Sequence, residues 1–427
     1  MTRIRRTLNN LTHVVGGELL LRLANLAVAV LIGRVYGVAA LGIYAAILAI
    51  ATVMERLADN GLELTGIAEV SRDPHGLGVI ATALYLDKAV LSFAALALLA
   101  IAAIALGIPG GQWSIAIILV ARTFLYSYCR LNAGLLKALD RTAYIIRIQT
   151  THFFILTACV LTIYSRKSSL VALLFCLLAG QFVEFIFASG VLRRLGLRFR
   201  SVPFSLCWSL LCRSTSVGMT YTFSTLMLRG DVVVLSLIAS TTVVGAFAAA
   251  DTGLAMIYVV AWLFSGILLS DLGRLSQNRL AFDAHVRECL RGVIAFGIPA
   301  AVIASFLARF GILLVFGRSF AAAALPGAVM MAALPFIFLN AAFLSRAIAR
   351  NAGHCALAIY GAGALLSLLL NYVLGRWQGA TGVAASIVIR EAAITLAFVC
   401  FWNLPERSPQ ATVAFKSSPE FAGMLNS

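Results

Sequence analysis

Long apolar stretches separated by short polar ones recur along the whole chain of 427 residues. Most of these stretches are close to 20 residues long, the length that a helix needs to cross the hydrocarbon core of a bilayer. The pattern predicts an all-α integral membrane protein with about 12 transmembrane helices. The predicted spans are residues 14–35, 40–58, 79–107, 113–134, 144–164, 169–191, 214–238, 243–269, 292–308, 325–346, 355–375 and 380–402.

The composition supports this class. The chain is 61% hydrophobic and 12% charged, whereas soluble domains average about 45–50% and about 25%. The basic residues 1–12 precede a span-length run without a small-residue cleavage site, so we expect the first helix to stay in the membrane. The eight cysteines show neither a zinc-site spacing nor a disulfide framework.

The lysines and arginines predict the orientation. The N-terminus, the even-numbered loops and the C-terminus hold 22 of the 33, and the opposite side holds six. Because cytoplasmic loops carry the excess of basic residues, we expect both termini in the cytoplasm and the chain in the inner membrane. The net charge of +16 then lies beside an anionic lipid leaflet, and nucleic acid is not needed to explain it.

The two halves of the chain resemble each other. Residues 40–46 are ALGIYAA and residues 243–249 are VVGAFAA, while LNAGLLKALDR at 131–141 resembles LNAAFLSRAIAR at 339–350. Both matches have an offset near 205 residues. Two six-helix halves that enter the membrane from the same side are related by an axis along the membrane normal.

We therefore predict an N-terminal lobe, helices 1–6, over residues 1–200 and a C-terminal lobe, helices 7–12, over residues 201–403. A basic, aromatic-containing connector covers residues 193–213. Apolar positions at helical spacing in residues 272–291 predict a short helix on the cytoplasmic surface. The polar tail, residues 404–427, is expected to be disordered.

Charged residues within the predicted spans are the strongest functional signal. Glu18, Arg22 and Asn25 share one face of the first span, and Arg122 and Tyr126 share a face of the fourth. A charge facing lipid is costly, so each of these faces points into a helix bundle or an aqueous cavity.

The second half shows the same pattern. Thr222, Thr225 and Arg229 lie on one side of the seventh span, and Arg390 lies beside Glu391 near the middle of the twelfth. Arginines that converge from several helices would make an electropositive cavity. Guanidinium groups match phosphate oxygens in bidentate geometry, so an anionic cargo is implied, with phosphate or diphosphate favoured over a carboxylate. The predicted cavity residues are Arg22, Asn25, Arg122, Tyr126, Arg229 and Arg390.

A structural explanation competes with the cavity, because buried charges commonly pair and hold helices together. Arg229 and Asp231 are two residues apart and cannot pair directly on a helix. For Arg34 and Arg130, near span ends, the favoured interpretation is that the side chain extends to the membrane interface.

Carboxylates inside the spans are candidates for ion coupling: Asp87, Glu184, Asp231, Asp251 and Glu391. The alternative is pairing with neighbouring cations, above all Asp87 with Lys88 and Arg390 with Glu391. His152 lies in a span and is interpreted as a hydrogen-bonded structural residue. Proton, sodium ion and membrane potential all remain open as driving forces.

The sequence lacks the motifs of an enzyme. It has no Walker-type glycine loop, no metal-ligand cluster and no nucleophile motif, and the predicted outer loops are short apart from residues 309–324. We therefore expect neither catalysis nor a cofactor nor a bound metal.

Five stretches carry a resemblance to a known family. They are LLRLANLAVAVLIGRVYGVAALGIYAAILAI (20–50), ERLADNGLELTGIAEVSRD (55–73), LRGDVVVLSLIASTTVVGAFAAADTGLAM (228–256), FGRSFAAAALPGAVMMAALP (316–335) and NYVLGRWQGATGVAASIVIRE (371–391). In their order and spacing they resemble the Wzx-like O-antigen and exopolysaccharide flippases of the multidrug/oligosaccharidyl-lipid/polysaccharide exporter superfamily.

The resemblance implies a twelve-helix, two-lobed, V-shaped fold like that of the MATE transporters, which opens alternately to the two sides. The implied cargo is an undecaprenyl-diphosphate-linked oligosaccharide for lipopolysaccharide O-antigen or exopolysaccharide synthesis. The implied partners are this lipid-linked substrate, membrane lipids, and the polymerase and glycosyltransferases of the same pathway. A cationic cavity is what a diphosphate headgroup requires.

Two other functions compete with the flippase. A drug/cation antiporter of the same superfamily would favour an acidic, aromatic cavity, which three central arginines oppose. An integral-membrane glycan polymerase or glycosyltransferase would need a large outer loop or an acidic metal site.

Overall fold

The computed structural model describes residue 20 and residues 22–105, 112–166, 169–275, 278–350 and 352–401. Within these residues all regular elements are helical. A helix over residues 22–36 is followed by α2 (Val38–Asp59), α3 (Leu62–Arg72), η1 (Pro74–Gly76), α4 (Leu77–Ala105), α5 (Trp113–Ala138), α6 (Thr142–Arg166), α7 (Leu170–Arg194), α8 (Phe204–Ile238), α9 (Thr241–Arg274), α10 (Arg279–Phe316), η3 (Arg318–Ala323), α11 (Ala324–Met331), α12 (Leu334–Ala349) and α13 (Gly353–Cys400).

The helices correspond to the twelve predicted spans. Nine helices of the described chain are long and apolar enough to cross a membrane, or ten when α11 and α12, bent by 43°, count as one span. Two further spans follow from the geometry. The first predicted span contains helix 22–36. The 48 residues of α13 fold back on themselves, because Arg390 donates to Ser367 at 3.0 Å and Ser386 contacts Asn371 across the bend. Gly379, with φ of 58°, divides α13 at the predicted boundary between spans 11 and 12.

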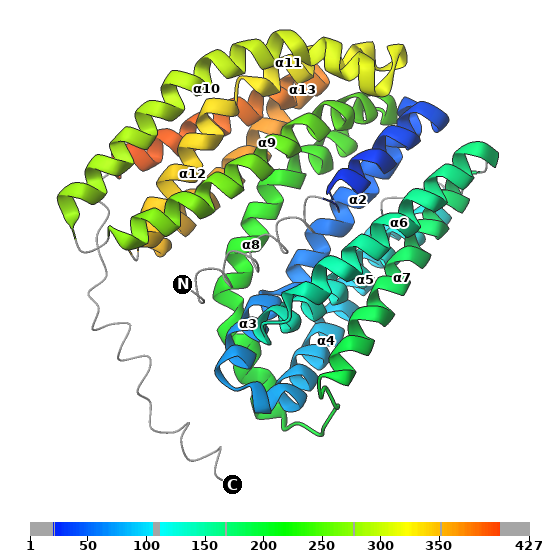
Figure 1. Cartoon of the computed structure of the whole chain (residues 1–427). Coiled ribbons are helices and arrows are strands. Elements are labelled where there is room, and N and C mark those ends of the chain that lie inside the picture. Colours follow the sequence, from blue (N-terminus) through cyan, green and yellow to red (C-terminus); the bar gives the residue numbers. More distant parts are fainter. Residues whose placement is uncertain are drawn as a thin grey trace.

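Two groups of helices make up the molecule. Figure 1 shows α2 to α7 on one side and α9 to α13 on the other, with α8 running between them. The first residues of α8, including Cys207 and Leu210, pack in an apolar cluster with α4, α5 and α7, and the rest of α8 packs along α13. α2 packs against α8 and α9 and so forms much of the contact between the groups.

The groups also touch at their predicted outer ends. The start of α2 packs on the start of α9 through Gly42 and Gly245. Arg34, at the end of helix 22–36, donates from Nε to the carbonyl oxygen of Val315 at 2.6 Å and also donates to that of Leu314. These carbonyls belong to the last turn of α10, where helical carbonyls lack partners within the helix.

Two predicted boundaries are wrong. α8 begins at Phe204, directly after Pro203, so half of the predicted connector is helical. The predicted separate surface helix over 272–291 is instead the end of α9 and the start of α10. The stretch from Arg279 to Arg291 contains neither glycine nor proline to end a helix. Phe282 and Val286 are buried against α9. The tail, residues 404–427, lies outside the described residues.

Candidate functional site

A cavity of about 350 Å³ lies between the two lobes. Helix 22–36, α2 and α5 border it on the N-terminal side, and α8 and α9 on the C-terminal side. On α2 the lining residues Leu41, Tyr44, Leu48, Thr52 and Arg56 recur every three or four positions and therefore share one helix face. Pockets of about 300–1,000 Å³ hold small-molecule ligands.

The cavity extends from the Gly42–Gly245 contact toward the predicted cytoplasmic side. The lining residues of α2 run from Leu41 to Arg56, and those of α9 from Ala248 to Met256. Both helices start at the predicted outer side. The lobes are thus in contact on the outer side of the cavity.

Arg22, Arg122 and Arg229 line this one cavity, although they come from three helices and from both lobes. Arg56 and Arg130 line it as well. The carboxylates among the lining residues are Glu55 and Asp251, so arginines outnumber acids by five to two. The cavity therefore carries an excess of positive charge and attracts anions.

Neighbouring groups hold these arginines in place. Arg122 is buried and donates from Nη2 to Asn25 Oδ1 at 3.2 Å, which links α5 to helix 22–36. Arg229 Nη1 lies 3.7 Å from Asp251 Oδ2, and the Arg229 side chain is 40% exposed. Asn25 and Asp251 line the cavity too, as does Tyr126.

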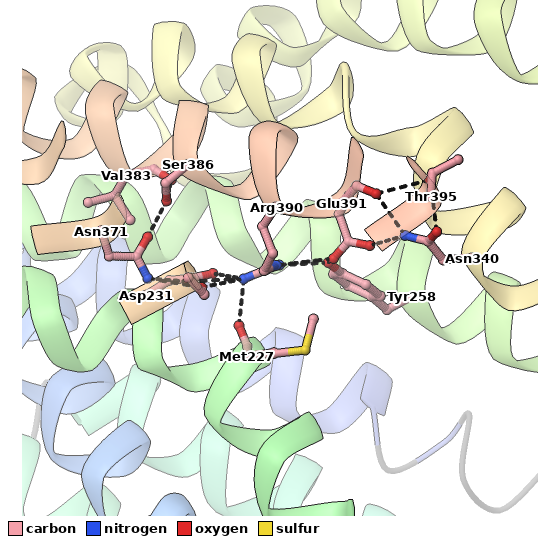
Figure 2. A network of polar contacts seen from close by, with 11 residues as sticks. Met227, Asp231, Tyr258, Asn340, Asn371, Val383, Ser386, Arg390, Glu391 and Thr395 are labelled. Atoms are coloured by element: carbon pink, nitrogen blue, oxygen red, sulfur yellow. Dashed lines mark hydrogen bonds and ion pairs between the residues drawn. The ribbon is translucent and has the colours of Figure 1, made fainter. Parts of the chain in front are cut away.

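Arg390 does not line the cavity, so this part of the sequence prediction is wrong. Its side chain is 1% exposed and donates to Asp231 at 3.2 Å, to Glu391 at 3.1 Å and to the carbonyl oxygen of Met227 at 2.7 Å. Figure 2 shows this network, which also includes Tyr258. The donors of the guanidinium are directed to partners on α8, α9 and α13, away from the cavity.

Two candidate coupling carboxylates, Asp231 and Glu391, belong to the same network. Asn371 donates to Asp231 at 2.6 Å, and Asn340 donates to Glu391 at 2.8 Å. The alternative interpretation of Glu391, an ion pair with Arg390, agrees with the 3.1 Å contact between the two side chains. Asp231 pairs with Arg390 and not with its chain neighbour Arg229, as the helical spacing required.

Asp87 does not pair with Lys88. Lys88 is fully buried and forms an ion pair with Asp59 of α2. Lys88 is therefore directed toward α2. Asp87 instead contacts Cys207 of α8, whose thiol donates a hydrogen bond to it.

An ion network in the N-terminal lobe was not predicted from the sequence. Arg130 donates to Glu63 at 2.6 Å and lies 3.6 Å from Asp59 and 4.0 Å from Glu55. Its side chain is 13% exposed, so the interpretation that it extends to the membrane interface is wrong. Glu55, Asp59 and Glu63 are spaced four residues apart, which would place three carboxylates on one face of a continuous helix and could have indicated this network. The helix is broken, however, between α2 and α3.

Glu184, the remaining candidate, lies on α7 with 8% exposure and contacts His152 of α6. Asp251 is therefore the candidate coupling residue that the structure places in the cavity. Across the described residues there is no group of three or more His, Cys, Asp or Glu side chains that could hold a metal ion.

The fold is shared with known transporters. The lipid II flippase MurJ, in an inward closed conformation, matches with a TM-score of 0.72 and 13% identity over 91% of this chain and 86% of that chain. A multidrug resistance MATE family transporter in an inward-facing conformation matches with a TM-score of 0.68 and 15% identity over 88% of this chain and 93% of that chain. The Vibrio cholerae MATE transporter VcmN matches with a TM-score of 0.63 and 15% identity over 93% of this chain and 97% of that chain.

The sequence comparisons identify the family. A search of curated protein sequences returns no significant match. The family described as polysaccharide biosynthesis protein matches residues 7–267, which is more than half of the chain. These residues include the helices that carry Arg22, Arg122 and Arg229. The chain is therefore a multi-pass membrane protein that belongs to the polysaccharide biosynthesis protein family, with the fold of the MurJ and MATE transporters.

Proposed function

We propose that the chain is a flippase that moves an undecaprenyl-diphosphate-linked oligosaccharide from the cytoplasmic to the periplasmic leaflet of the inner membrane. The observation that carries the proposal is the meeting of Arg22, Arg122 and Arg229 around one cavity between the lobes. The membership of the polysaccharide biosynthesis protein family supports a glycan-linked cargo. The cargo would serve O-antigen or exopolysaccharide synthesis.

The arginines would bind the diphosphate. A guanidinium presents a planar fork of N–H donors to two phosphate oxygens, and it keeps its charge at every accessible pH. Two of the three arginines, Arg22 and Arg122, belong to the N-terminal lobe, and Arg229 belongs to the C-terminal lobe. A diphosphate held between them would draw the lobes together, so cargo binding would favour one arrangement of the lobes over another.

Transport would proceed by alternating access. In this structure the lobes touch on the predicted outer side of the cavity through α2 and α9. Separation of this contact and closure on the cytoplasmic side would expose the same arginines to the periplasmic leaflet. The lipid tails would stay in the bilayer, and the polymerase and glycosyltransferases of the pathway would act before and after this step. No covalent chemistry is part of the proposal.

A drug/cation antiporter is less well supported. Its cationic cargo would meet five arginines and two carboxylates in the cavity. The charge of the cavity therefore favours an anion, and dye-efflux assays would separate the two functions.

The test is complementation of a strain that lacks the protein, scored by polysaccharide displayed on the cell surface. Because a hydrogen bond to a charged group contributes about 1.5–3 kcal/mol, each of Arg22→Ala, Arg122→Ala and Arg229→Ala should reduce display about tenfold or more. The triple variant should abolish it. Arg309→Ala, which changes an exposed arginine of α10 outside the cavity, is the matched control. Normal display by the triple variant, at equal amounts of folded protein, would overturn the proposal.

A further inference from the structure

A histidine and a carboxylate form a buried pair in the N-terminal lobe. His152 Nδ1 of α6 lies 2.8 Å from Glu184 Oε2 of α7, and the two residues are 2% and 8% exposed. Both lie near the middle of their helices. Ionisable residues in this position are costly and commonly mark ion or proton sites.

This pair differs from the other buried carboxylates of the described chain. Asp59 is paired with Lys88, while Asp231 and Glu391 are paired with Arg390. An arginine keeps its charge at any accessible pH, so the cation beside Asp231 and Glu391 is permanent. The partner of Glu184 is an imidazole, whose charge depends on whether it holds one proton or two. Of the other two buried carboxylates in the described chain, Glu55 lies near Arg56 and Arg130, and Asp87 contacts the thiol of Cys207. Glu184 differs from all of these because its partner can gain or lose a positive charge.

A side chain of the cavity wall connects this pair to the cavity. Gln181, one turn before Glu184 on α7, lines the cavity and donates from Nε2 to Glu184 Oε2 at 2.7 Å. In the described part of the chain, Gln181 Oε1 and both ring nitrogens of His152 are buried without a hydrogen-bond partner, with Nδ1 2.8 Å from Glu184 Oε2. Leaving a buried polar atom without a partner is unfavourable, so a ring nitrogen of His152 can take up a proton and Gln181 Oε1 can accept a hydrogen bond from a polar ligand.

Charged and titratable groups on the surrounding helices are few. From α5, Cys129 contacts Gln181 through a 3.3 Å hydrogen bond that its sulfur accepts, and Arg122 lies two turns away on the same helix face. Arg130 of α5 points to Glu63 instead. On α6, Arg147 is exposed, and on α7 the next charges after Glu184 are Arg193 and Arg194 at the helix end.

We propose that His152 and Glu184 form a proton-binding site that is coupled to the cavity through Gln181. With one proton, on Nδ1, the imidazole is neutral and the pair carries the single negative charge of Glu184. A second proton from the aqueous phase binds Nε2 and makes an imidazolium–carboxylate pair with no net charge. The only bond formed is N–H, and it breaks when the proton leaves.

The coupling follows from the charges. The unprotonated pair adds a negative charge beside a cavity that binds anions, and protonation removes it. An anionic cargo and the proton therefore favour each other's binding, and this effect is reciprocal. This step rests on the proposed function, because it takes the cargo to be a diphosphate. The proton site itself does not depend on the cargo.

The site is tested by infrared difference spectra between pH 8 and pH 5, recorded on the full-length protein in phosphatidylcholine vesicles. In the wild type we expect linked changes of imidazole and carboxylate bands. Glu184→Gln should alter the imidazole bands, and His152→Gln should alter the carboxylate bands, because the two side chains lie 2.8 Å apart and a proton on one changes the charge beside the other. His354→Gln, which removes an exposed histidine, should leave the linked bands in place. If Glu184→Gln fails to fold, the imidazole and carboxylate bands of the wild type are compared with those of His152→Gln and the conservative Glu184→Asp. Independent imidazole and carboxylate bands would overturn the proposal.

A second measurement separates the two proposals. Binding of undecaprenyl diphosphate is compared at the same two pH values in the wild type and in Glu184→Gln. A weaker pH dependence of binding in Glu184→Gln than in the wild type supports the coupling. The same pH dependence of binding in both proteins overturns it. If the wild type binds no undecaprenyl diphosphate at either pH while the linked bands are present, the proposed cargo is wrong and the proton site stands.

Discussion

Gly42 of α2 and Gly245 of α9 form a reciprocal backbone contact between the two lobes. A Cβ atom on Gly42 would lie 1.9 Å from the carbonyl oxygen of Thr241, and one on Gly245 would lie 1.9 Å from that of Val38. Each of these carbonyls belongs to the residue four positions before the opposite glycine. The two glycines also occupy matching positions in the repeated stretches ALGIYAA and VVGAFAA. The repeat in the sequence thus corresponds to a symmetric contact in the structure.

This contact has no room for a methyl group, so Gly42→Ala or Gly245→Ala must separate α2 from α9. Overpacking of this kind costs about 1–3 kcal/mol, which lowers the ratio of closed to open outer contact by about fivefold to about 150-fold. We expect faster hydrogen exchange at residues 38–46 and 241–249 and a strong loss of polysaccharide display. Hydrogen-exchange mass spectrometry of the reconstituted protein measures the first effect.

Gly266→Ala is the matched control for this prediction. Gly266 lies on the same helix, α9, and a Cβ atom there would have no neighbouring heavy atom within 4 Å. Exchange and display should stay at the wild-type level in this variant. Wild-type exchange in both Gly42→Ala and Gly245→Ala would show that the contact does not hold the lobes together.

The architecture could be predicted because it depends on local features of the chain. Hydrophobic length gives the spans, and glycines such as Gly37 and Gly379, both with positive φ, mark the breaks between them. The convergence of Arg22 and Arg122 was also predictable, because a polar face on an otherwise apolar helix must turn inward.

The partners of the buried charges could not be predicted in the same way. Lys88 pairs with a residue 29 positions away, and Arg390 with one 159 positions away. Such pairs depend on how the helices pack and rotate against each other, which helical periodicity within one span does not specify. The partner of Arg130 could not be predicted for the same reason, because Glu63 lies on α3, outside the predicted spans.

The Lys88–Asp59 pair is predicted to stabilise the N-terminal lobe. Lys88→Met would remove the cation and leave Asp59, which is 4% exposed, with Arg130 as its remaining cation at 3.6 Å. Breaking a buried ion pair by removal of one partner costs about 3–5 kcal/mol. Thermal unfolding of the purified protein in detergent should therefore show a clearly lower melting temperature.

A double substitution tests whether the pair causes this loss. Lys88→Met combined with Asp59→Leu removes both charges and should recover part of the stability, because no uncompensated buried charge is left. Arg72→Ala, which breaks an exposed pair with Glu69, should leave the melting temperature almost unchanged. Equal losses in the single and double variants would mean that Lys88 contributes by packing alone.

Arg390 and Arg229 should respond in opposite ways to the same substitution, because one guanidinium is buried in an ion network and the other lines the cavity. Arg390→Met would leave Asp231 and Glu391 buried without their cation, at a cost of about 3–5 kcal/mol, and the protein should lose thermal stability or fail to accumulate. Arg229→Met changes a side chain that is 40% exposed, so folding should be preserved while polysaccharide display is lost. Melting temperature and display, measured side by side for both variants, distinguish a structural arginine from one that contacts cargo. A stable Arg390→Met protein without display would place Arg390 in the transport step, and the assignment of its network to structure would then be wrong.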